Sequence, residues 1–158
     1  MRKIFIILIL FFLSQCSGYS PIYSKKELNF YFDKIDSNSK NFFDAKIKQQ
    51  LNNYKISTND KFDKKKLDII FNSNFNREVT SKDKKKNPDT FRMVLKFNVT
   101  VINDKNQKSY LNYSESFNYN KSDRSEFEIK QYEQVIKDNL INEVIDNLIR
   151  DILITIQK

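Results

Sequence analysis

The chain has 158 residues, a length that suits one domain, with one Cys, one Gly and no His or Trp. This composition leaves no imidazole base, no Cys–His pair and no His or Cys cluster for zinc, and a single Gly excludes a dinucleotide fingerprint or a phosphate-cradling loop. The net charge of +8 permits contact with anionic membranes or nucleic acid and does not choose between them.

The chain begins with the pattern of an export signal. Arg2 and Lys3 precede an unbroken apolar run, residues 4–13. That run is too short to span a bilayer as a helix, which needs about 20 residues, and it fits the apolar region of a secretory signal peptide. Export argues against a cytosolic role, so we expect no nucleic-acid partner.

Cys16 stands where the signal peptide should be cut. Leu13-Ser14-Gln15-Cys16 resembles a bacterial lipobox, although Gln15 replaces the usual small residue. An ordinary signal with an incidental Cys is the alternative, but this Cys has no intramolecular disulfide partner. We therefore expect residues 1–15 to be a signal peptide and residues 16–26 to be a lipidated tether. Cys16 would carry a diacylglyceryl group and an amide-linked acyl chain such as palmitate, which together make a stable anchor.

The mature chain opens with a predicted strand and a predicted helix. Residues 27–35 alternate between apolar and polar, which is the period of a strand. Residues 39–54 repeat apolar positions at intervals of three and four, which predicts a helix capped by Ser39 or Asn41. The apolar residues that carry these two patterns are Leu28, Phe30, Phe32, Phe43, Ile47, Leu51 and Tyr54.

Three further strands are predicted over residues 66–79, 90–102 and 108–119. A connection at 80–88 joins the first two, and a hairpin turn at 103–107 joins the last two. Because Gly is missing from this turn, any left-handed residue in it must be Asn or Asp. The residues expected to face inward are Leu67, Ile69, Phe71, Phe75, Phe91, Met93, Leu95, Phe97, Val99, Val101, Leu111, Tyr113, Phe117 and Tyr119.

From Ser125 onward the period is helical, and Ser125 with Glu128 has the spacing of a capping box. About 30 residues would make a helix of roughly 45 Å. The order β-α-β-β-β-α predicts a single α+β domain over residues 27–158. We expect a two-layer sandwich in which two helices cover one face of a four-stranded, mostly antiparallel sheet, while the other face is polar.

The run Cys16-Ser17-Gly18-Tyr19-Ser20-Pro21-Ile22-Tyr23 resembles the mature N-terminus of the LPS-assembly lipoprotein LptE family, with Ser17 inserted. The element order and the long last helix resemble that family too. The resemblance implies a non-enzymatic lipoprotein without a cofactor, anchored on the periplasmic side of the outer membrane. It would plug and scaffold the LptD β-barrel during assembly of lipopolysaccharide at the cell surface.

The densest basic run, residues 82–88, is either a solvated loop or a phosphate-binding tip. The resemblance implies lipopolysaccharide contacts near the loop between strands 2 and 3. Those contacts would fall on Lys82, Lys84, Lys85, Lys86 and Arg92. If the loop is only a solvated turn, the place to look is around Arg92, Lys121 and Arg124.

Two other functions stay open at the level of sequence. One is a lipid-anchored periplasmic binding or adaptor protein of another envelope transport system, with the same fold and no barrel. The other is a carboxylate-dependent periplasmic hydrolase, which requires a cleft with two close carboxylates. The acidic residues are scattered along the chain and form no such pair in sequence, so we expect neither a catalytic site nor a metal site.

Overall fold

The computed structural model describes residues 28–55, 64–121 and 124–156. The predicted signal peptide, the tether and Cys16 lie outside these ranges. In chain order the elements are β1 (Phe30–Ser37), α2 (Phe42–Leu51), the 3₁₀ turn η2 (Asn52–Tyr54), β2 (Lys65–Lys82), β3 (Pro88–Asn103), β4 (Lys108–Asn120) and α3 (Glu126–Ile156). The predicted order of strands and helices is confirmed.

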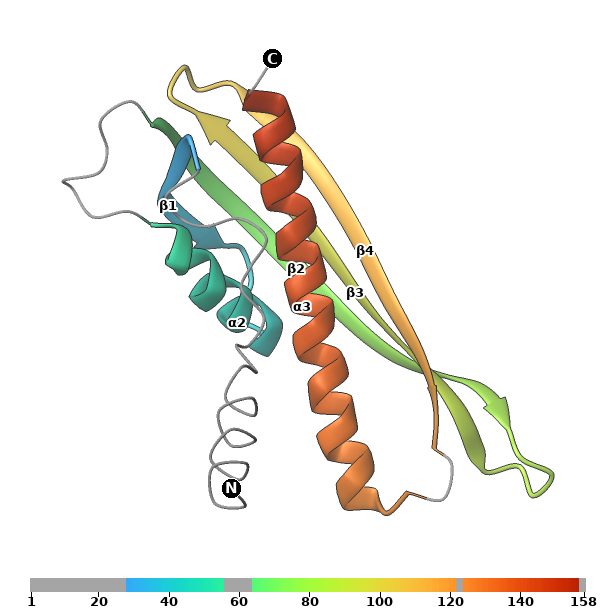
Figure 1. The fold of residues 1–158 in the computed structure, drawn as a ribbon. Coiled ribbons are helices and arrows are strands. Elements are labelled where there is room, and N and C mark those ends of the chain that lie inside the picture. Colours follow the sequence, from blue (N-terminus) through green and yellow to red (C-terminus); the bar gives the residue numbers. More distant parts are fainter. Residues whose placement is uncertain (1–27, 56–63, 122–123, 157–158) are drawn as a thin grey trace, which may run out of the picture.

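The four strands form one sheet in the order β1-β2-β3-β4. β1 runs parallel to β2, whereas β2 and β3, and β3 and β4, are antiparallel. Both helices lie on the same face of the sheet, α2 beside β1 and β2 and α3 across β3 and β4 (Figure 1). The α+β two-layer sandwich predicted from the sequence is therefore confirmed.

The alternation in the strands sets the register of the core. In β3, Leu95 and Phe97 are completely buried while Lys96 between them is exposed. One stripe of α3, which includes Leu140 and Leu148, is buried in the same hydrophobic cluster as Leu95 and Phe97. Burying one such Leu side chain contributes about 1.5–3 kcal/mol. The opposite face of the sheet, formed by the even-numbered residues of β2, β3 and β4, is called the open face below.

The start of α2 is fixed by a buried carboxylate. Asn41 caps the helix, and its side-chain oxygen accepts a hydrogen bond from the Asp44 amide at 2.7 Å. The Asp44 carboxylate is 1 % exposed and accepts hydrogen bonds from the hydroxyls of Ser37, Ser39 and Ser73. It also accepts the Ser73 amide at 2.8 Å. Through Asp44, α2 is joined to the end of β1 and to the middle of β2.

Burial alone would raise the pKa of Asp44. The three hydroxyls and the Ser73 amide outweigh burial and hold this pKa below its ordinary value. Helix N-termini also favour a negative charge in the first turn. Asp44 is therefore an ionised group that the fold keeps in its interior.

The predicted capping box of α3 is present. The Ser125 amide donates to Glu128 Oε2 at 2.8 Å, and the Glu128 amide donates back to Ser125 Oγ at 3.3 Å. Like the other helices in the described ranges, α3 lacks the combination of length and apolar character needed to cross a membrane.

Polar pairs join α3 to β4 along the edge of the sandwich. The Tyr113 hydroxyl donates to Asp151 Oδ2 at 2.9 Å, and Asn147 Nδ2 donates to Glu115 Oε1 at 2.8 Å. These hydrogen bonds satisfy the inward-facing polar groups of Tyr113 and Glu115 in β4. The contact between α3 and β4 at this edge of the core is therefore partly polar.

Candidate functional site

The hairpin between β2 and β3 is longer than the sequence predicts. Residues 80–88 were expected to form a connection, but β2 continues to Lys82 and β3 begins at Pro88. β4 accompanies β3 only as far as Thr90, which pairs with Asn120. Residues 80–90 therefore project beyond the body of the molecule (Figure 1), and we call them the distal hairpin.

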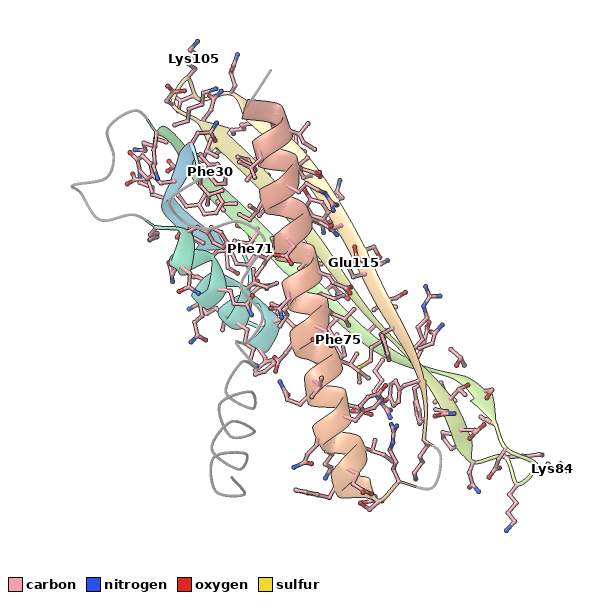
Figure 2. The ribbon with its side chains drawn as sticks, in the orientation of Figure 1. Phe30, Phe71, Phe75, Lys84, Lys105 and Glu115 are labelled. Atoms are coloured by element: carbon pink, nitrogen blue, oxygen red, sulfur yellow. The ribbon has the colours of Figure 1, made fainter. Side chains whose placement is uncertain are left out.

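The predicted lysines occupy the end of this hairpin. Lys82 is the last residue of β2, and Lys84, Lys85 and Lys86 lie in the turn. All four are exposed, and Figure 2 shows Lys84 at the tip, far from Lys105 in the turn between β3 and β4. The structure thus gathers four cations on a projecting tip.

The turn itself is held by Asp83. Its Oδ1 accepts the amides of Lys85 and Asn87, both at 2.8 Å, and its carbonyl oxygen accepts the Lys86 amide at 2.9 Å. The amide of Asn87 is the largest cause that lowers the pKa of Asp83. Lys86 has φ 66°, a left-handed conformation that costs a residue with a Cβ about 1 kcal/mol. In the turn after β3, Asn106 takes this conformation at φ 58°, as predicted.

Arg92 is not part of the lysine cluster. It lies on the open face, four residues into β3 from Pro88 and therefore about 13 Å along the strand. Its Nη2 donates to Ser116 Oγ of β4 at 3.1 Å. The structure places the predicted binding residues in two groups, the lysine tip and a site nearer the body.

That second site is an open groove of about 570 Å³, which we call the arginine groove. It contains Arg92 and Arg124, and the Arg124 guanidinium lies 4.3 Å from the centre of the Tyr132 ring. Lys121 lines a neighbouring groove of about 300 Å³ instead. The residues of the arginine groove are Thr80, Thr90, Arg92, Asn118, Tyr119, Asn120, Arg124 and Tyr132.

A further arginine anchors the base of the distal hairpin. Arg77 lies 3.9 Å from the centre of the Phe91 ring, and its Nε donates to the Tyr119 hydroxyl at 2.9 Å. Its Nη2 lies 2.9 Å from Glu133 Oε1 of α3. Burial and the hydrogen bond to Glu133 raise the pKa of Tyr119 to about 12.

From the sequence, Arg77 and Arg92 flank the basic run on its two strands and are expected to offer paired hydrogen bonds to an anion. The sequence also indicates a structural role for Arg77. This residue continues the inward-facing phase of Leu67, Ile69 and Phe71, so a charge at that position requires a partner across the core.

Tyr119 of β4 and Glu133 of α3 hold the Arg77 guanidinium in place, although 37% of its side chain stays exposed. The other exposed cations at this end include the tip lysines, Arg92, Lys121 and Arg124.

The cationic side chains at the distal end are suited to bind anions. Lysine ammonium groups act as mobile point charges, and guanidinium groups bind phosphate or carboxylate with paired hydrogen bonds. Thr80 and Thr90 add hydroxyls that bond one another at 2.9 Å. Within the described ranges, no group of three or more His, Cys, Asp or Glu side chains is arranged to hold a metal.

Two solved structures resemble this arrangement over most of the chain. The crystal structure of rare lipoprotein B from Shewanella oneidensis matches with a TM-score of 0.54 and 15% identity, covering 80% of this chain and 96% of that one. The solution structure of an uncharacterized lipoprotein B from Nitrosomonas europaea matches with a TM-score of 0.54 and 10% identity, covering 85% and 90%. The chain has the lipoprotein B fold.

At such low identity the likeness to lipoprotein B is one of fold. No protein-family model matches the sequence, and no curated protein matches it. The match nevertheless covers at least 90% of each of the two solved chains, so it extends over nearly the whole of both.

Proposed function

We propose that this protein is an outer-membrane lipoprotein of the LptE family, anchored on the periplasmic side through Cys16, and that it takes part in lipopolysaccharide assembly. The observation that carries the proposal is the coincidence of two independent features. One is the lipobox-like run ending at Cys16, and the other is the lipoprotein B fold of the domain that follows. A signal cysteine occurs on many folds and a fold hosts many functions, so the combination is more specific than either feature.

Its partner in this proposal is an LptD-like β-barrel, for which the domain acts as plug and scaffold. The lumen of an outer-membrane barrel is polar and wet. The open face suits such surroundings, because most side chains in the middle of β2, β3 and β4 there are neutral and polar, with Lys96, Ile70 and Val94 as exceptions. The neutral polar side chains include Asn72, Asn74, Asn98, Asn112 and Ser114. The role requires no catalytic group and no cofactor.

The distal end would contact lipopolysaccharide. This glycolipid carries phosphates and carboxylates, which the four lysines of the tip attract over a distance of about 10 Å at ordinary ionic strength. The arginine groove lies nearer the body and offers two guanidinium groups and hydroxyls for closer contacts. In this proposal the tip captures the anionic head group and the groove binds it with defined geometry.

Affinity purification of the tagged full chain from membranes tests the proposed function. We expect a large outer-membrane β-barrel to co-purify, and the Cys16→Ser variant to leave the membrane fraction while its domain stays folded. Mass spectrometry of the mature N-terminus should show the added mass of acyl groups on Cys16. Co-purification of an inner-membrane transporter in place of a barrel would favour the adaptor function, and an unmodified thiol would contradict the anchor.

A further inference from the structure

The two edges of the sheet differ in how they are protected. β1 has eight residues, and its pairing with β2 is interrupted by a bulge between Phe32 and Ile35. The bulge carries Asp33 and Lys34, and Asp33 Oδ2 lies 2.8 Å from Lys66 Nζ. Short length, a bulge and charges are the usual devices that prevent a further strand from adding to an edge.

β4 lacks most of these devices. It has 13 residues, and it pairs with β3 from Lys108 to Asn120 without a register shift. It contains neither Gly nor Pro. Its charged residues are Lys108 at the first position and Glu115, whose carboxylate accepts a hydrogen bond from Asn147 of α3 and is thereby directed away from the edge.

Among the described residues, no strand pairs with the outer side of β4. Figure 1 shows β4 as the last strand of the sheet, with α3 over its inner face and no described element beyond it. Every second residue of an edge strand presents its N–H and C=O outward. β4 therefore offers a regular ladder of free backbone groups about 40 Å long.

The side chains beside this ladder define what can add to it. On the open face they are Tyr110, Asn112, Ser114, Ser116 and Asn118, which are exposed and uncharged. On the helix side Leu111 and Tyr113 are half-buried and Phe117 is 43% exposed. A strand added here would find a neutral polar flank on one side and a partly apolar flank on the other.

We propose that the outer edge of β4 is the docking site for an extended strand of a partner protein. Only a backbone in extended conformation repeats donors and acceptors at the spacing of the ladder. The partner strand should alternate, with apolar side chains beside Phe117 and the helix side and neutral polar side chains beside Asn112 and Ser114. The setting, a membrane complex, rests on the proposed function, whereas the edge and its occupant rest on the geometry of β4.

A matched pair of variants separates docking at the edge from docking on the open face. Asn112→Lys/Ser114→Lys places two charges on β4. Asn72→Lys/Asn74→Lys places the same charges on β2, opposite the same β3 residues, Asn98 and Lys96. Both pairs lie on the open face, which a polar and wet lumen would leave solvated. Their effects on the fold and on seating in a barrel should therefore be alike, but only the β4 pair lies at the edge.

Residue-resolved amide hydrogen exchange on the full chain purified from membranes with its bound partners is the measurement. In the chain alone, alternate amides of β4 should exchange rapidly while the others are protected by β3. In the membrane complex the rapid half should slow by at least about 100-fold, since paired amides exchange only on opening. The β4 variant should lose this protection and release the partner, and the β2 variant should keep both.

Equal exchange of β4 in the complex and in the chain alone, with a barrel bound, overturns the docking site and leaves the proposed function standing. Loss of the partner in both variants assigns the contact to the open face and also overturns it. Protection of β4 in the pure chain as it dimerises assigns the edge to a second copy, which again contradicts the proposal. Protection by a partner that is not a barrel supports the docking site and contradicts the proposed function.

Discussion

β2 divides into two regions that differ in the burial of their side chains. From Leu67 to Ser73 every second residue is buried, but from Asn76 to Lys82 every residue is exposed. The first region packs against α2 and belongs to the core cluster that also contains residues of α3. The second region leads into the distal hairpin, which neither helix covers (Figure 2). One strand can therefore serve the core with half of its length and present charge with the other half.

The distal hairpin therefore adds little to the hydrophobic stabilisation of the fold. Its residues bury little apolar surface, and exposed ion pairs and lysines contribute little to stability. The hairpin is held at its tip by the Asp83 turn and at its base by the contacts of Arg77 with Tyr119 and Glu133. Mutations in the packed region should therefore change the free energy of unfolding, and mutations in the distal hairpin should change binding.

The largest effect is expected in the packed region at Leu95. Leu95→Asp places an unpaired charge at a completely buried position and should cost more than about 4 kcal/mol of unfolding free energy. Lys96→Asp, one residue away on the open face, should cost less than about 1 kcal/mol. Urea denaturation measures both values. Equal costs would contradict the register of β3.

The next largest effect is expected at Asp44. Asp44→Ala leaves the buried Ser73 amide and hydroxyl groups without their acceptor and should cost about 3 kcal/mol. Asp36→Ala is the control, since Asp36 is exposed and lies 3.7 Å from Lys48, and it should cost less than about 1 kcal/mol. A similar small cost for both variants would show that Asp44 does not join α2 to the sheet.

Asp44 should also make stability depend on pH. Its pKa in the folded protein is lowered from the model-compound value of 3.8, so the native state binds this proton less readily than the unfolded state. The contribution of Asp44 is complete above about pH 4 and is lost as the pH falls through the lowered pKa of the folded state. Thermal melts between pH 2 and pH 6 should show a shallower acid loss for Asp44→Asn than for the unchanged chain.

The packed region was predictable from the sequence because its pattern is periodic. The inward phases of Phe30, Leu95 and Leu140 follow from alternation or helical spacing, and each is buried. The capping box at Ser125 was also predictable, since both of its partners lie within one turn. Patterns of this kind depend only on residues that are close in sequence, so they can be read without knowing which distant residues come into contact.

The remaining features depend on residues that are far apart in the chain. Asp44 of α2 meets Ser73 of β2. Arg92 shares a groove with Arg124 because β3 pairs with the end of β4, shortly before the chain reaches Arg124. Residues 80–82 were expected to belong to the connection, but they continue β2. Pairing with β3 supplies backbone hydrogen bonds there that sequence periodicity does not reveal.

The smallest effect on stability is expected at the tip of the distal hairpin. Replacing its four lysines by Gln should change the unfolding free energy by less than about 1 kcal/mol. A matched control removes the same charge from exposed lysines away from the hairpin, Lys40, Lys55, Lys105 and Lys108. Chemical denaturation of both variants checks that the fold of each is kept.

Lipopolysaccharide binding by these two variants decides whether the tip of the distal hairpin is a binding site. At low ionic strength the tip variant should bind at least about tenfold more weakly, which corresponds to about 1.4 kcal/mol. The control should bind as the unchanged chain does. The difference should shrink at high salt, because screening removes the long-range attraction. Equal binding by the tip variant and the unchanged chain at low salt would contradict lipopolysaccharide binding by the four lysines and leave the tip as a solvated turn.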